Sequence, residues 1–174
     1  MAKKCAEVVK NILDQNSCNY QIEKKGSQIT FTLDSQYNDF IDDCPMYYFA
    51  VAERHRLFIY VSLKPIIKGD SQVSVSKLLS RINKDIAASG IGTDLRVELA
   101  IQEGIVNIRY TTLFRKCPED YEIATVMSMP LLLMHKFGNW IIAVACGELS
   151  VEEAYEEIQN IQEEPDNKAY FDIM

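Results

Sequence analysis

Two consecutive strand-like segments in the middle of the chain are apolar at almost every position. The first covers residues 46–52 and the second residues 57–63, with four charged or polar residues between them. Neighbouring side chains of a strand point to opposite faces of a sheet, so these strands have two apolar faces to bury. Such strands are typical of the centre of a covered sheet. We therefore predict a central hairpin with a covering layer on each side.

We expect one face of this hairpin to pack against the chain's own helices and the second to contact another surface. The residues predicted to share that second face are Tyr48, Ala50, Ala52, Phe58 and Tyr60. Large exposed apolar patches usually mark interaction sites, so we predict that Tyr48, Ala50, Phe58 and Tyr60 contact a protein. Alternatively, the apolar segment 123–146 of the same chain folds back over this face. If it does not, a second subunit or a client protein covers the face, and a homodimer is the commonest such arrangement.

Hydrophobic periodicity predicts the remaining elements. Helices are expected over residues 2–15, between the turn at 68–70 and Gly90, from 118 to about 137 with a kink or break at Pro130, and from 150 to about 162. Alternating patterns predict hairpins over 20–33 and 95–110. Residues 140–146 either continue the third helix or form a buried strand, and we favour the helix. The expected order is α-β-β-β-β-α-β-β-α-α, an α+β class with helices packed on an antiparallel sheet, in a single domain of residues 1–174.

The charge is concentrated at one end of the sequence. The chain has a formal net charge of −7, and residues 148–174 contain nine acids and one base, so residues 1–147 are close to neutral. This balance disfavours a nucleic-acid or anionic-membrane partner. The acidic face of the last helix consists of Glu152, Glu153, Glu156 and Glu157. It is either a solvated face or an arm that repels wrong partners and meets a basic one.

Nothing in the residue pattern assigns a catalytic, cofactor or metal site. The 90–95 segment begins like a dinucleotide fingerprint but follows a helix and lacks the last glycine, and the three aspartates of 39–43 do not have calcium-loop spacing. Two histidines and five cysteines without paired spacing predict no zinc site and a reducing, cytoplasmic environment. No secretory signal or membrane span is expected. Cys117, between basic residues and a helix start, is the one candidate nucleophile.

Three segments carry a resemblance to a known family. They are Leu78-Leu79-Ser80-Arg81-Ile82-Asn83-Lys84, Leu95-Arg96-Val97-Glu98-Leu99 and Gly104-Ile105-Val106-Asn107-Ile108-Arg109-Tyr110. With the order of elements, the region from 75 to about 146 resembles the bacterial sensory-transduction-regulator (YbjN-like) family. The resemblance implies a type III secretion chaperone-like fold and action through protein contacts rather than catalysis. The related chaperones pair as dimers and bind extended client segments.

These observations favour a non-catalytic cytoplasmic module, chaperone-like or regulatory. It would bind a protein partner of unknown identity through an apolar sheet or helix surface. The alternative is a small-ligand-binding protein or an enzyme with an unrecognised pocket that uses Cys117.

Overall fold

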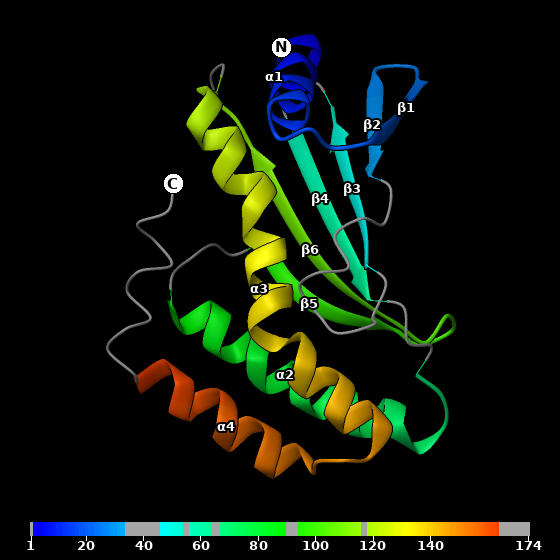
Figure 1. Cartoon of the computed structure of the whole chain (residues 1–174), viewed down its shortest axis with the longest axis vertical. Coiled ribbons are helices and arrows are strands. Elements are labelled where there is room, and N and C mark those ends of the chain that lie inside the picture. The colour runs from blue at the N-terminus through cyan, green and yellow to red at the C-terminus, as the bar shows by residue number, and fades with distance from the viewer. Residues whose placement is uncertain are drawn as a thin grey trace.

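The chain folds into a six-stranded antiparallel sheet with four helices, as seen in a computed structural model that describes residues 2–33, 46–53, 56–63, 67–89, 94–115 and 118–163 (Figure 1). The elements are α1 (Ala2–Gln15), β1 (Tyr20–Lys25), β2 (Gln28–Leu33), β3 (Met46–Ala52), β4 (Arg56–Leu63), α2 (Asp70–Ser89), β5 (Leu95–Ala100), β6 (Ile105–Leu113), α3 (Asp120–Cys146) and α4 (Val151–Glu163). The predicted α+β class and the predicted order of elements are confirmed.

The strands lie in the order β1-β2-β3-β4-β6-β5. The first four strands form a meander, and α2 then leads to β5 at the far edge, from which β6 returns to pair with β4. β3 and β4 are therefore interior strands, as their two-sided apolar pattern predicts. Strand pairing also places β6 next to this central hairpin and β5 beyond β6, although both strands come later in the chain than α2.

The register of the central hairpin separates the five residues that were predicted to share a face, and Ala52, which pairs with Leu57, lies on the face of Tyr48 and Ala50. Tyr48 pairs with Val61 and Ala50 with Ile59, whereas Phe58 pairs with Val51 and Tyr60 with Phe49. Directly paired residues of an antiparallel ladder lie on the same face. Tyr48 and Ala50 therefore lie on one face, and Phe58 and Tyr60 on the other.

The prediction of one shared face is wrong because of the length of the connection between the strands. Ala52 pairs with Leu57, so four residues separate the last pair of the hairpin. Because this number is even, even-numbered residues of β3 pair with odd-numbered residues of β4. Since side chains alternate with a period of two, this parity decides which residues share a face.

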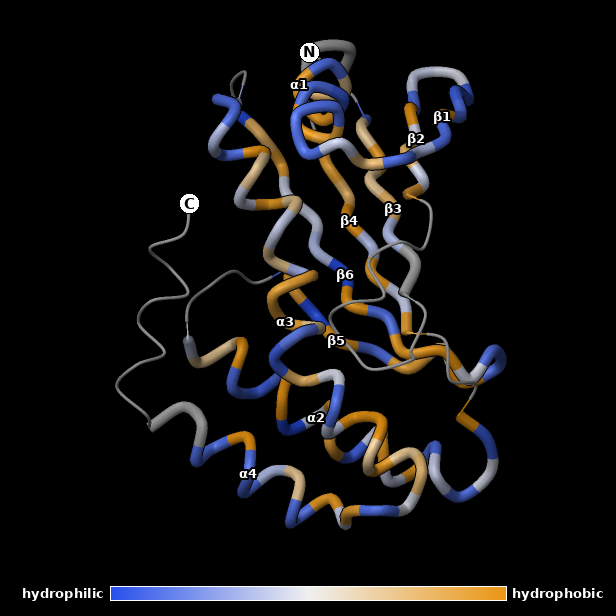
Figure 2. The backbone as a smooth tube through the Cα atoms, in the orientation of Figure 1, coloured by the Kyte–Doolittle hydropathy of each residue, from blue (hydrophilic) through white to orange (hydrophobic). Residues whose placement is uncertain are grey.

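All four helices lie on the face that carries Tyr48 and Ala50 (Figure 1). α1 packs on β3, α3 crosses β4 and β6, α2 packs along β5, and α4 forms an outer layer on α2 and α3. The sheet side of this core is fully buried at Ala50, Ala52, Leu57, Ile59, Val61, Leu63 and Ile108. Figure 2 shows the apolar residues gathered along β3, β4 and the part of α3 that crosses the sheet.

α3 is one continuous helix of 27 residues that includes Pro130, which settles residues 140–146 as helix. It is the one described helix long and apolar enough to cross a membrane by length and composition, and 44% of its most apolar window is buried within the protein. Its buried side covers the face of Tyr48, whose hydroxyl donates a hydrogen bond to the Met127 carbonyl at 3.0 Å. The predicted folding of 123–146 over the sheet is therefore seen, but on the face of Tyr48 and Ala50 only.

A single side chain of α2 closes the outer edge of β5. Asn83 Nδ2 donates a hydrogen bond to the Val97 carbonyl at 2.6 Å, and the Val97 amide donates one to Asn83 Oδ1 at 2.8 Å. Unpaired backbone groups on an edge strand are a template for pairing with another chain. Asn83 satisfies both groups of Val97 in the way that a neighbouring strand would.

We predict that replacing Asn83 by alanine lowers the free energy of unfolding by about 1–3 kcal/mol, because two partly buried backbone groups lose their partners. Lys84→Ala is the matched control, since Lys84 is the next residue of α2 and is exposed. Urea unfolding followed by circular dichroism measures both variants. Equal midpoints for Asn83→Ala and Lys84→Ala would contradict this role.

Candidate functional site

The face of the sheet turned away from the helices carries a strip of large apolar side chains at its centre. Phe58 and Tyr60 of β4 lie beside Val51 and Phe49 of β3, as two directly paired couples. Val51 is 8% exposed, and the three aromatic side chains are partly buried. We call these four residues the aromatic strip, and the face that they share the outer sheet face. None of the helices that the structure describes lies on it.

Two arginines extend the row of Tyr60 toward the β5 edge. Arg109 of β6 pairs directly with Tyr60, and Arg96 of β5 pairs directly with Arg109. The same row continues in the other direction to Phe49. Adjacent strands are about 4.8 Å apart, so the two guanidinium stems and the two rings occupy a row about 15 Å long.

The two arginines place like charges side by side, and one of them has an unsatisfied donor. Within the described part of the chain, Arg109 Nε is buried and has no hydrogen-bond partner, whereas Arg96 is exposed. The ion pairs of the described residues are Lys10–Asp14 and Arg81–Glu152, neither of which includes Arg96 or Arg109. Like charges directly opposite each other destabilise a sheet, and a buried donor without a partner costs about 1–3 kcal/mol. A carboxylate placed over Arg96 and Arg109 would relieve both penalties.

Polar side chains surround the aromatic strip. Ser62 donates a hydrogen bond to Asn107 Oδ1 at 2.5 Å across β4 and β6. Thr30 and Thr32 of β2 lie on the other side of the strip, paired with Val51 and Phe49. An apolar centre with a polar rim is the usual anatomy of a protein–protein interface.

The outer sheet face is more basic than the chain as a whole. The strands contribute four cations to it against two carboxylates, and these residues are Lys25, Arg56, Arg96, Arg109, Glu23 and Glu98. The whole chain has a net charge of −7. The net charge of the chain alone does not indicate this local excess of cations.

Half of the predicted contact residues belong to this face. Phe58 and Tyr60 lie on it, whereas Tyr48 is 4% exposed and Ala50 fully buried beneath the helices. Phe49, Arg96 and Arg109 are additional members that were not predicted as contacts. The alternation of residues 95–110 does indicate that Arg96 and Arg109 point away from the core, but their position beside Tyr60 depends on the strand order.

The predicted acidic residues of α4 are all exposed, and two of them have local structural partners. Arg81 Nη2 donates to Glu152 Oε1 at 2.9 Å. The amide of Ser150 donates to Glu153 Oε2 at 2.8 Å, and the Glu153 amide donates to the Ser150 hydroxyl. These hydrogen bonds, first the one from the Ser150 backbone, lower the pKa of Glu153. For Glu156 and Glu157, the other two residues of the acidic face, no such bond is seen among the described residues.

A cluster around Asp85 fixes α4 on α2. The Tyr155 hydroxyl lies 3.0 and 2.9 Å from the two carboxylate oxygens of Asp85, and Gln159 Nε2 donates to the same carboxylate at 2.9 Å. The guanidinium of Arg81 lies 5.2 Å from the centre of the Tyr155 ring. Burial, and next the hydrogen bond to Asp85, raise the pKa of Tyr155. The last turns of α4 therefore lie beside the end of α2.

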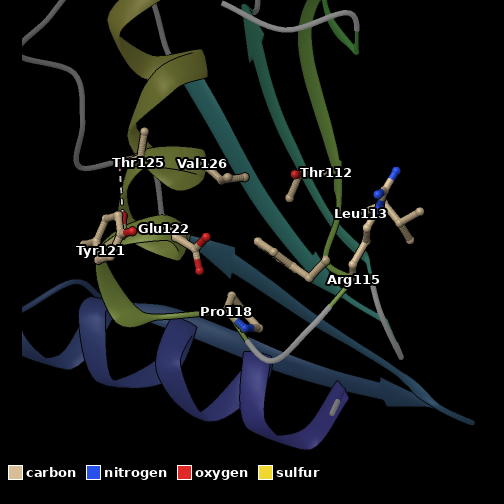
Figure 3. A pocket seen from close by; sticks show the side chains of 9 residues that line it. Thr112, Leu113, Arg115, Pro118, Tyr121, Glu122, Thr125 and Val126 are labelled. Atoms are coloured by element: carbon tan, nitrogen blue, oxygen red, sulfur yellow. Dashed lines mark hydrogen bonds between the residues drawn. The ribbon is translucent and has the colours of Figure 1, made fainter.

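An open pocket of about 430 Å³ lies between the end of β6 and the first turns of α3 (Figure 3). Two of its polar lining residues already form local hydrogen bonds. Thr125 Oγ1 donates to the Tyr121 carbonyl at 2.9 Å, and Glu122 Oε2 accepts the Glu119 amide at 2.7 Å in the capping box that begins α3. Cys117, the candidate nucleophile, lies outside the described residues, so its reactivity remains a prediction.

The other candidate residues from the sequence lie partly outside the described residues. The three aspartates of 39–43 and His55 lie outside the described residues, and His135 is exposed on α3. Within the described part of the chain, no three His, Cys, Asp or Glu side chains are grouped so that they could hold a metal ion.

The sequence matches no protein-family model, and neither the curated proteins nor the solved structures provide a match to it. The resemblance to the sensory-transduction-regulator family therefore remains a prediction.

We predict opposite effects for glutamate at neighbouring positions of β4. Phe58→Glu should change the free energy of unfolding by less than about 1.5 kcal/mol, because the carboxylate points out from the sheet face without helices. Ile59 is fully buried against the helices. Ile59→Glu should therefore unfold the protein, because it places an unpaired charge in the core. Thermal melts by circular dichroism measure both, and loss of folding in Phe58→Glu would show that its face is core.

We also predict a pH-dependent contribution from Tyr155. Its pKa is raised in the folded protein, so its stabilising effect is complete below the ordinary tyrosine pKa of about 10 and is lost as the pH rises through the raised value. Tyr155→Phe should cost about 1 kcal/mol at neutral pH. The difference from the unmodified protein should shrink or reverse at a pH above the raised pKa, where the ionised hydroxyl no longer donates to Asp85. Urea unfolding at both pH values tests this, and a pH-independent difference would contradict it.

Proposed function

We propose that the protein is a non-catalytic interaction module that binds another protein through the outer sheet face. The observation that carries the proposal is the Tyr60–Arg109–Arg96 row, in which a buried guanidinium nitrogen lacks a partner beside large apolar side chains. Unsatisfied buried donors are rare in folded proteins and call for an explanation. A bound partner supplies one, since it would provide both the missing acceptor and the cover for the rings.

The chemistry of this face supports a partner that is acidic and apolar. The four strip residues offer apolar area, and the excess of cations among the strand residues favours carboxylates. Aromatic and arginine side chains are the residue types that dominate protein interfaces energetically. Two copies packed through this same face would bring two cationic surfaces together, so charge favours a different protein over the homodimer that was also predicted.

Aromatic rings and arginines on a sheet face also suit single-stranded nucleic acid. The net charge of −7 disfavours that partner, because it repels the phosphate backbone beyond the immediate site. The small-ligand alternative has less support, since the pocket beside α3 is open and two of its polar side chains, Glu122 and Thr125, already form hydrogen bonds with the backbone at the start of α3. A cytoplasmic location, a bacterial origin and a chaperone-like or regulatory role are part of this proposal, through the family resemblance.

A photo-crosslinking amino acid introduced at Tyr60 tests the proposal in living cells. We expect irradiation to produce protein adducts larger than the 19.9 kDa chain. Lys77 of α2 is the control position, because it is exposed on the helical side of the molecule. A second change, Arg109→Glu, should remove the adducts by reversing the charge beside Tyr60.

Each outcome of this experiment has a definite meaning. Adducts that depend on Tyr60 and Arg109 and contain a second protein support the proposal. An adduct of twice the chain mass identifies a second copy of this chain, and a nuclease-sensitive adduct identifies nucleic acid. Equal labelling from Lys77, or no adduct from Tyr60, overturns it.

A further inference from the structure

We infer that the chain carries an internal ligand for its own outer sheet face, namely residues 164–174, which compete there with the protein partner. This inference rests on the proposed function, because it assigns the first occupant of the same face. It depends on three observations: the chemistry of the segment, the place at which α4 ends, and the neighbouring Arg96 and Arg109, of which Arg109 has a buried nitrogen without a partner among the described residues.

The segment contains the carboxylates and large apolar side chains that would complement the outer sheet face. Residues 164–174 read Glu-Pro-Asp-Asn-Lys-Ala-Tyr-Phe-Asp-Ile-Met, with three acids and one base. Asp172 lies between Phe171 and Ile173, so one short stretch presents a carboxylate flanked by large apolar side chains. The site presents the complementary pattern, with Arg96 and Arg109 beside the rings of the aromatic strip.

α4 ends beside the end of α2, and α2 is followed along the chain by the edge strand β5. Gln159 near the end of α4 contacts Asp85 near the end of α2. The two helices run side by side in the same direction, since Glu152 contacts Arg81 one turn earlier (Figure 1). α2 ends at Ser89 and is followed closely by the edge strand β5, which begins at Leu95 and carries Arg96. The chain therefore leaves α4 near the edge of the sheet that leads to the arginines.

The length of the segment is sufficient for this path. Nine residues separate Glu163 from Asp172, and an extended chain spans about 3.3 Å per residue, which gives about 30 Å. The path passes two layers of about 10 Å each, α4 on α2 and α2 on β5, and then one or two strand spacings of about 4.8 Å, which together give about 25–30 Å. At full extension Asp172 can therefore reach Arg109 around β5, with the apolar residues on either side of it next to the aromatic strip. Docked there, the segment satisfies Arg109 and covers the strip until a partner with the same chemistry displaces it.

A photo-crosslinking amino acid at Phe171 of the full-length protein tests this docking. Purified protein is irradiated at low salt and digested, and the linked peptides are identified by mass spectrometry. We expect links to peptides of β4 and β5 within one chain, with a yield that does not depend on protein concentration. Links to the helical side, or no link to the sheet, overturn the inference. A yield that rises with concentration also overturns it, because the segment then binds a second copy.

Charge variants test whether the arginines recognise the segment. Arg109→Glu should lower the crosslinking yield by about tenfold, because it replaces a charge-assisted hydrogen bond by repulsion. Arg56→Glu is the matched control, since Arg56 lies on the same face at the distant end of β4. Combining Arg109→Glu with Asp172→Lys should restore the yield. An equal effect of Arg56→Glu and Arg109→Glu would contradict recognition by this arginine pair.

The failure of this inference is distinguishable from the failure of the proposed function. Larger adducts from Tyr60 in cells, without any link from Phe171 to the sheet, leave the interaction module intact and remove the internal ligand. Where both are present, Asp172→Lys should increase the adducts from Tyr60, because the partner then meets less competition. An unchanged adduct yield would show that the segment does not compete.

Discussion

The register between β3 and β4 is the constraint on which the rest of the structure depends. Both strands are apolar on both sides, so hydrophobicity alone does not decide which set of side chains enters the core. Pairing Ala52 with Leu57 makes that choice for every residue of the hairpin at once. It places small residues such as Ala50 beneath the helices, where α1 and α3 approach the sheet closely, and leaves Phe58 and Tyr60 on the outside. A shift of one residue would reverse both faces.

The same choice explains why one side of the sheet holds all four helices. The face of Tyr48 is apolar across β3, β4 and β6, and α3 is long enough to cross it as a single helix despite Pro130. α2 and α4 then complete the layer around α3 and are held together by the contacts of Asp85 and Arg81. The outer sheet face is left with a mixed composition, and this mixture of rings, hydroxyls and arginines is suited to binding rather than to a permanent core.

Local patterns in the sequence predicted the helices and strands well, because periodicity is a property of neighbouring residues. The fold class and the order of elements followed directly. The membership of the outer sheet face did not follow, because it depends on the parity of a four-residue connection and on a strand order in which β6 lies between β4 and β5. The row from Tyr60 to Arg96 joins residues 36 positions apart. Likewise, Asn83 is an ordinary polar residue of a helix until α2 lies along β5.

The side-chain amide of Asn83 makes the two edges of the sheet different in their ability to accept another strand. Because it occupies the middle of the β5 edge as a one-residue substitute for a strand, a seventh strand cannot be added there without displacing a side chain held by two hydrogen bonds. Among the described residues, the opposite edge, β1, presents the exposed charged residues Glu23, Lys24 and Lys25 against such an addition. Any growth of this sheet by strand exchange between molecules would therefore be one-directional, and it would stop at a pair of molecules joined through β1 instead of continuing into a fibre.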